Sequence, residues 1–257
     1  MRRRALRAAP ALFVALASAA CSGDADPAPE AAPAKTRREI DLAVAASAKL
    51  LEEGYRAKRT GRNGFALERF ERACAKLASA VGRSDPRYAS CLDDEAMVLV
   101  RLGRYDEARG LLDTAAQILA RAPGADPRLE AGVALRRRLI DRLEARGVRC
   151  AEPEKPPAES ALPYFPPVVE MQTALGRLND YVRHCAAGPP RMVTVRVTIT
   201  GNGEPVMVEV RGEEPGSKVG ACLERELMKR VGDAELPRFG ACFRPFTYPY
   251  TLGGSSP

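Results

Sequence analysis

The sequence predicts an α+β chain in which helical hairpins are followed by a helix-strand-strand-helix-strand unit. Three observations lead to this fold class. Apolar residues recur at helical spacing in the first half of the chain, and one helical phrase returns there after 42 residues. Six prolines then fall within residues 150–167. Beyond them, apolar and polar residues alternate as they do in half-buried strands.

The amino-terminal residues 1–20 have the pattern of a secretory signal. Four arginines precede a short apolar run and three small residues. The run is shorter than the roughly 18 residues that a membrane-spanning helix needs. Two ways of processing remain open. Signal peptidase can cut after Ala20, or the segment Ser18 to Cys21, which resembles a bacterial lipobox, receives a diacylglyceryl anchor on Cys21.

Residues 21–35 are predicted to form a disordered tether. They are mainly Ala, Pro, Ser, Gly and acidic residues, with too few apolar side chains to build a core. Ser22, rather than Asp, follows the cysteine, which by analogy with Gram-negative sorting favours the outer membrane. We therefore expect a lipoprotein on the periplasmic face of the cell envelope, attached to the membrane through Cys21. A soluble exported protein is the alternative.

The basic charge of the chain does not indicate a nucleic-acid partner. The formal net charge is +7, and removal of the signal takes away four arginines. Nucleic-acid binding requires aromatic residues interleaved with the basic ones, whereas this chain has no Trp and few aromatics. We interpret the remaining basic clusters as solvated helix faces.

Residues 36–149 are predicted to fold as helical hairpins. The phrase that begins at Gly61 returns at Gly103, so that Ala66 aligns with Ala108. An Asp-Pro-Arg breaker also recurs before each following helix. A near-fixed period of this size is typical of stacked helical units. A plain helical bundle is the alternative.

The stretch "CLDDEAMVLVRLGRYDEARGLLDTAAQILARAPGADP" resembles a tetratricopeptide repeat of the longer, 42-residue kind. Its small residue Ala96 suits a close helix crossing, Gly103 suits the turn, and Tyr105 and Ala115 suit packing positions. Residues 127–147 are expected to form the polar capping helix that such arrays require at their ends.

This resemblance implies a peptide-binding groove on the concave face made by the first helix of each unit. The groove positions that it implies are Leu51, Tyr55, Lys58, Arg59, Asp93, Met97, Val100 and Arg101.

Residues 168–253 are predicted to form a small αβ domain, joined to the helices by a Pro-rich linker over 150–167. In the first strand Val193, Val195 and their alternate neighbours face one way while threonines and an arginine face the other, which predicts one buried face. A Gly-Asn-Gly turn, a second strand, an amphipathic helix and an aromatic strand ending at Leu252 follow.

This order resembles the TonB-like carboxy-terminal domain found in AgmX/PglI-type gliding-motility proteins. The resemblance is carried by Cys185, the turn at 201–203, Cys222 and the Pro-containing strand from Phe246 to Tyr250. Where the family has Trp-x-Phe-Pro, this chain has Leu-Pro-Arg-Phe at 236–239.

The TonB resemblance has two implications. It implies that a partner peptide binds by strand addition at the last strand, near Phe246, Tyr248 and Tyr250. It also implies a disulfide between Cys185 and Cys222.

The remaining cysteines are expected to pair as well. An even number in an exported chain is typical of disulfides. Cys74 and Cys91 are placed to meet across a helical turn, which leaves Cys150 and Cys242. Free buried thiols are the alternative.

No catalytic residue and no cofactor is predicted. The cysteines lack C-x2-C spacing, so we expect no metal site. The only histidine, His184, is expected to be a surface residue, because a bridged Cys185 has no thiolate to offer as a nucleophile. The sequence thus predicts a non-catalytic adaptor that binds an envelope protein or peptide and no small-molecule substrate. The alternative is a structural or assembly subunit of an envelope complex, such as a motility, secretion or transport machine.

Overall fold

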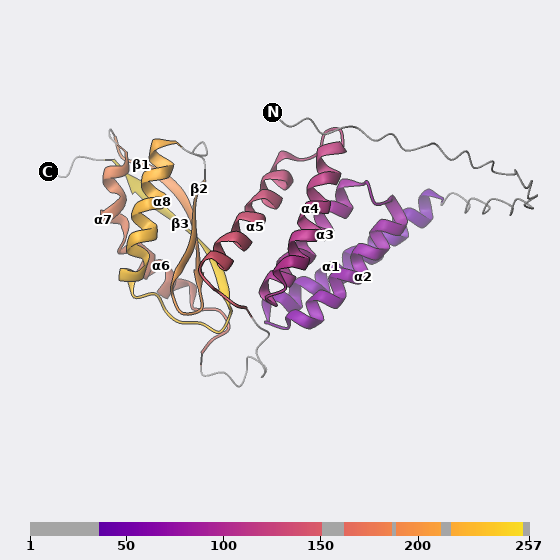
Figure 1. Cartoon of the computed structure of the whole chain (residues 1–257), viewed down its shortest axis with the longest axis horizontal. Coiled ribbons are helices and arrows are strands. Elements are labelled where there is room, and N and C mark those ends of the chain that lie inside the picture. The colour runs from indigo at the N-terminus through magenta and orange to yellow at the C-terminus, as the bar shows by residue number, and fades with distance from the viewer. Residues whose placement is uncertain (1–35, 151–161, 187–188, 212–216, 254–257) are drawn as a thin grey trace, which may run out of the picture. The chain divides into compact units, whose positions relative to one another are not determined.

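The computed structural model describes residues 36–150, 162–186, 189–211 and 217–253, which lie in one compact unit. The fold is mixed α+β, with helices first and a small antiparallel sheet toward the carboxy terminus (Figure 1). The predicted signal peptide, the tether with Cys21 and most of the predicted linker are outside the described residues. Among the described residues, no helix combines the length and apolar composition needed to cross a membrane.

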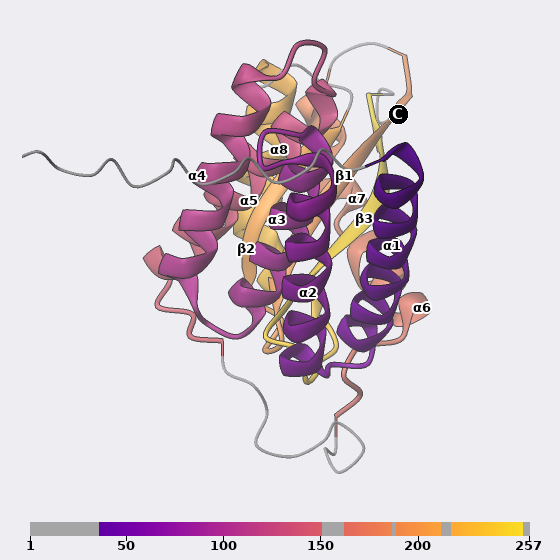
Figure 2. The same ribbon diagram turned by 90° about the vertical axis from the view of Figure 1, so that its right-hand side faces the viewer.

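Two helical hairpins and a fifth helix form the first half of the described chain. The helices are α1 (Arg37–Arg59), α2 (Asn63–Val81), α3 (Pro86–Arg101), α4 (Tyr105–Arg121) and α5 (Pro127–Ala145). In Figure 2, α1, α2 and α3 lie side by side. Side-chain caps fix the starts of α1, α3 and α5. For α3, the Asp85 carboxylate accepts the Arg87 N–H at 2.8 Å, with Pro86 as the first helical residue. Asp126 caps α5 in the same way.

Small residues set the spacing between these helices. Ala66, Ala96, Ala108 and Ala115 are all fully buried, so neighbouring backbones approach closely. Gly54 serves the same purpose, since a Cβ there would lie 3.1 Å from the ring of Phe70. The repeated small residues in the sequence thus occupy the crossings of one helical core.

Helix α5 has arginines where the other helices have small residues. Arg136 pairs with Asp93 of α3, and Arg137 pairs with Asp113 of α4. The apolar face of α5 still enters the helical core through Val133, Ile140 and Leu143. The arginine run is therefore in part a set of contacts to preceding helices rather than a fully solvated face.

The second half of the described chain is built around a three-stranded sheet. Its elements are α6 (Val168–Gly176), α7 (Asn179–Val182), the 3-10 turn η2 (Arg183–Cys185), β1 (Arg191–Thr200), β2 (Pro205–Arg211), α8 (Lys218–Arg230), η3 (Val231–Ala234) and β3 (Phe243–Leu252). The strand order is β2-β1-β3, and both pairs are antiparallel. The first strand of the sheet is thus its middle strand.

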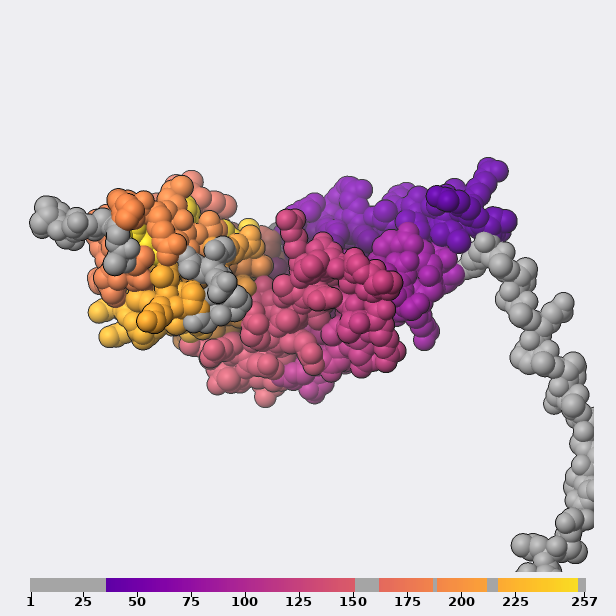
Figure 3. Space-filling model, turned by 90° about the horizontal axis from the view of Figure 1, so that it is seen from above, coloured from indigo at the N-terminus to yellow at the C-terminus, as the bar shows by residue number. Residues whose placement is uncertain are grey.

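One face of the sheet forms a core with α6, α7 and α8, as the alternation predicts. Val195 and Val197 of β1 and Leu223 and Leu227 of α8 are fully buried there. The expectation of only one buried face is wrong, because Thr198 on the opposite face is 2% exposed. Part of that face lies against the helices: β2 contacts α5, and Met207 joins the helical core. In Figure 3 the orange and yellow residues of the sheet half adjoin the pink residues of the helical half.

Three disulfides fix the described chain, and they are the three pairs that the sequence analysis expects. Cys74 is bonded to Cys91, Cys185 to Cys222, and Cys150 to Cys242. The first joins α2 to α3, the second joins η2 to α8, and the third joins the helical half to the sheet half.

Hydrogen bonds support the junction that the third disulfide makes. The Tyr105 hydroxyl donates to the Val148 carbonyl at 2.9 Å, and Asn63 donates to the Tyr164 hydroxyl at 3.3 Å. The backbone N–H of Gly240 donates to the Pro163 carbonyl at 2.9 Å. The predicted linker is therefore anchored at both of its described ends.

Candidate binding surface

The structure brings part of the predicted groove together at the junction of helices and sheet. Lys58 at the end of α1 interacts electrostatically with Asp93, Asp94 and Arg101 of α3 and with Arg136 of α5. The shared location follows from the repeat, which places α1, α3 and α5 on equivalent sides of successive hairpins.

The other predicted groove residues contribute unequally. The Tyr55 hydroxyl donates to the Asp94 carboxylate, and its ring packs edge-on against Phe70. Met97 is half-buried against the helical core, whereas Arg59 is exposed at the last turn of α1. Tyr55 is thus committed to a neighbouring helix rather than free to receive a ligand.

Two ionisable groups here are shifted by burial. Burial raises the pKa of Asp93 to about 6, although its ion pair with Arg136 opposes the shift. Burial and the hydrogen bond to Asp94 raise the pKa of Tyr55. Both shifts favour the neutral forms, and Asp93 therefore takes up a proton in mildly acidic solution.

Lys58 forms no ion pair within the described residues, although the charges of Asp94 and Asp93 act on it. Its Nζ lies 4.8 Å from the centroid of the Tyr55 ring. Burial lowers its pKa to about 8; Asp94 opposes this shift, and Arg101 adds to it. Part of the Lys58 population is therefore deprotonated in mildly alkaline solution.

Arg101 and Arg244 lie beside the same aromatic ring. The guanidinium carbon of Arg244 is 3.9 Å from the centroid of Phe165, and that of Arg101 is 5.8 Å from it. Arg101 is also 5.8 Å from the ring centroid of Phe243. Burial lowers the pKa of Arg244, and the charge of Arg101 lowers it further. The two guanidinium groups therefore repel each other in a partly buried environment.

We call Lys58, Arg101 and Arg244 the cationic seam. All three side chains are half-buried, and no carboxylate in the part of the chain that the structure describes forms an ion pair with them. The Nε and Nη1 atoms of Arg101 are buried without a hydrogen-bond partner. The seam thus has positive charge and free donors for an anion.

The predicted peptide contacts on β3 need correction. Tyr250 is completely buried and Phe246 is 9% exposed, so their side chains belong to the sheet core and cannot contact a peptide. Tyr248 is half-buried, and its ring lies tilted against that of Tyr250, with the centroids 4.8 Å apart. Alternation along the strand puts all three on the face that α6, α7 and α8 cover. The expectation from the TonB resemblance concerned the edge of the strand and did not take this packing into account.

The free edge of β3 offers few hydrogen-bond donors. β3 is an edge strand, and Pro245 and Pro249 have no N–H to give, which places them at positions facing away from β1. At another such position, the Thr251 N–H donates to the side chain of Asn179 at 3.0 Å. Thr247 is then the only donor between the two prolines. This edge is poorly suited to strand addition.

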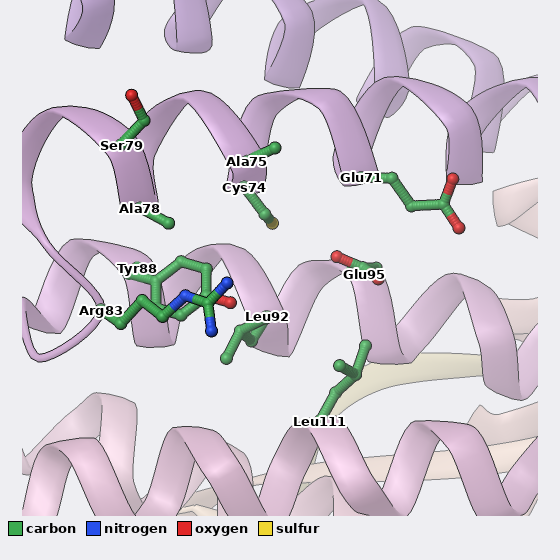
Figure 4. A pocket seen from close by; sticks show the side chains of 10 residues that line it. All are labelled: Glu71, Cys74, Ala75, Ala78, Ser79, Arg83, Tyr88, Leu92, Glu95 and Leu111. Carbon is green, nitrogen blue, oxygen red and sulfur yellow. The ribbon is translucent and has the colours of Figure 1, made fainter. Parts of the chain in front are cut away.

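A separate pocket of about 450 Å³ lies among α2, α3 and α4, as Figure 4 shows. Glu71 and Glu95 lie on its α2 and α3 walls, and Leu111 of α4 closes one side. Burial, together with the negative charge of Glu71, raises the pKa of Glu95 to about 7. The pocket therefore holds a carboxyl group that is partly protonated near neutral pH.

The cationic seam differs from this pocket in its chemistry. It combines a planar guanidinium with unsatisfied donors, two further cations and the faces of Phe165 and Phe243. Such a set can donate charge-assisted hydrogen bonds to a carboxylate while apolar neighbours exclude water. Its parts come from α1, α3, β3 and the segment before α6. No protein-family model, curated protein or solved structure matches this chain.

Proposed function

We propose that this chain is a non-catalytic adaptor that binds a carboxylate-bearing segment of a partner protein at the cationic seam. The observation that carries the proposal is Arg101, whose Nε and Nη1 atoms are buried without a partner. A buried donor left unpaired costs about 1–3 kcal/mol, and more when it is charged. A ligand that fills those positions recovers this energy.

A carboxylate suits the seam better than a neutral group. Arg101 presents charged N–H donors, and Arg244 and Lys58 add two charges that form no ion pair with a carboxylate of the described chain. The rings of Phe165 and Phe243 give apolar side chains next to the carboxylate a surface to contact. A segment containing Asp or Glu beside apolar residues satisfies both requirements.

The resemblances in the sequence are consistent with an adaptor. We interpret α1 to α4 as two tetratricopeptide-like hairpins and the elements from α6 to β3 as a TonB-like domain. Support for the first comes from the turn glycines Gly61 and Gly103, which have φ of +78° and +74° at equivalent positions. Support for the second comes from the helix-strand-strand-helix-strand order and the disulfide between Cys185 and Cys222. Both kinds of domain bind peptides.

We place the adaptor on the periplasmic face of the cell envelope, attached through a lipid on Cys21. Disulfides form and persist in oxidising compartments, and three of them join the described cysteines. The signal-like residues 1–20 and the Ala- and Pro-rich residues after Cys21 support the same location.

The test measures binding of labelled peptides to the full chain by fluorescence anisotropy. One peptide library carries Asp and Glu among apolar residues, and a matched library carries Asn and Gln. We expect the full chain to prefer the acidic library and Arg101→Lys to weaken that binding about tenfold, because the charge remains but the guanidinium donors are lost. Affinity should fall as pH rises through 8, where Lys58 loses its proton.

A variant with Lys58, Arg101 and Arg244 all changed to Gln should lose the preference for the acidic library. The matched control changes three exposed arginines to Gln, namely Arg56, Arg72 and Arg225. Equal losses in the two triple variants would mean that net charge alone attracts the peptides. Self-association in sedimentation velocity without any peptide binding would favour the assembly subunit and overturn the adaptor.

A further inference from the structure

The only histidine in the chain lies against a disulfide. His184 and Cys185 are neighbours in η2, and Cys185 is bonded to Cys222 in α8. The Nε2 atom of His184 is 3.9 Å from Sγ of Cys222. The three potential ligand atoms of this corner all lie within 4.8 Å of one another. The sequence analysis expected His184 to be a surface residue, and its side chain is exposed.

These three groups are ligands that zinc prefers. Tetrahedral zinc binds thiolate sulfur at about 2.3 Å and imidazole nitrogen at about 2.0–2.1 Å. Two ligands of one tetrahedral ion are then about 3.5–3.8 Å apart. The separation between Nε2 and the Cys222 sulfur already comes close to this value. Only the two sulfurs, joined by a covalent bond, are too close together.

We propose that opening the Cys185–Cys222 disulfide converts this corner into a zinc site. A dithiol reductant cleaves the S–S bond, becomes a cyclic disulfide itself and leaves two thiols on the protein. When Zn²⁺ binds, both thiols release their protons to solvent, the neutral His184 ring binds through Nε2, and a water molecule takes the fourth position. The site is closed to metal while the disulfide is intact.

The surroundings of the three groups fit this role. Cys185 is 9% exposed, whereas Cys222 is half-buried and His184 is exposed, so a small reductant and a metal ion can approach from the His184 side. η2 and α8 are also held near each other without the disulfide, because Val182, Leu223 and Leu227 are fully buried in the same core. Neither the helical core nor the cationic seam takes part.

The histidine distinguishes this disulfide from the other two. No histidine can lie near Cys74–Cys91 or Cys150–Cys242, because His184 is the only one in the chain. Reduction of either of those bonds supplies two thiolates and no imidazole. Zinc should therefore bind at the His184 corner more tightly than at the other reduced pairs.

The experiment measures how Zn²⁺ is shared between the full chain and a chromogenic chelator. The chain is used either oxidised or after reduction with a dithiol that is then removed. We expect one equivalent to bind tightly to the reduced chain and none to the oxidised chain. His184→Ala should weaken this binding about tenfold or more. The paired change Cys185→Ser with Cys222→Ser should abolish it, whereas Cys150→Ser with Cys242→Ser should leave it intact.

A second readout separates ligation from a structural effect of the substitutions. Because the chain has one histidine, the proton NMR signals of its ring report on this corner alone. We expect them to shift when Zn²⁺ is added to the reduced chain and to stay fixed in the oxidised chain. Unchanged ring signals, equal zinc affinity of His184→Ala, or loss of the fold on reduction each overturn the proposal.

Discussion

The sharpest test of the junction between helices and sheet is Gly103→Ala. Gly103 has φ of +74°, which costs an alanine about 1–2 kcal/mol. A Cβ there would also lie 2.1 Å from the carbonyl oxygen of Cys150, so that backbone must move by about 1 Å. Such overpacking adds about 1–3 kcal/mol. We expect a total loss of about 2–5 kcal/mol in the free energy of unfolding.

Gly124→Ala is the matched control. Gly124 has φ of +73°, and a Cβ there would meet nothing within 4 Å, so this variant reports the backbone cost alone. The assay is urea unfolding followed by circular dichroism without reductant. Equal losses at the two glycines would refute the steric part of the reasoning.

A double-mutant cycle tests what holds the Cys150 carbonyl in place. The disulfide to Cys242 restrains it, so the excess penalty of Gly103→Ala over Gly124→Ala should shrink when both cysteines are changed to Ser. If the excess penalty of Gly103→Ala is unchanged in the variant without the disulfide, the backbone around Cys150 is rigid without that bond.

Three further outcomes follow from the described structure. Changing Cys150 and Cys242 to Ser should lower the free energy of unfolding by about 4–5 kcal/mol, because the bond closes a long loop, and urea titration measures this loss. Tyr248→Pro should destabilise the chain by about 2 kcal/mol more than Thr247→Pro, because the N–H of Tyr248 points to β1 and that of Thr247 faces away. Comparable unfolding midpoints of the two variants would contradict this assignment. Because the pKa of Glu95 is raised, the folded chain binds a proton there more tightly than the unfolded chain does. The free energy of unfolding should therefore decrease as the pH rises from 4.5 to 7, and Glu95→Gln should reduce this decrease in a series of thermal melts.

The sequence predicted the local features of the fold well. Helical spacing, Asp-Pro starts and the alternation around Val195 depend on neighbours in the chain, and they appear as α1 to α5 and β1. The second buried face of the sheet was missed because it depends on α5, which lies far from Thr198 in sequence. Threonine is compatible with either a buried or an exposed position, so the alternation alone could not reveal it.

The cationic seam shows the same limit. Tyr55, Asp93 and Arg101 were expected near a common groove because equivalent helices of a repeat present equivalent faces. Arg244 and Phe165 come from the other half of the chain, and only tertiary packing brings them to Arg101. Tyr164 and Phe165, two aromatic residues in the Pro-rich segment 150–167, were the one signal in the sequence that this segment packs against the rest of the chain.

The strand order has a consequence for how the chain folds as it is made. β1 lies in the middle of the sheet, yet its second neighbour, β3, is synthesised only after β2, α8 and η3. Until then β1 carries an open, valine-rich edge that could join another copy of the chain. Completion of β3 covers that edge and replaces it with one interrupted by Pro245 and Pro249. A chain truncated before β3 should therefore aggregate, which makes the pairing of β3 with β1 the step that completes the sheet.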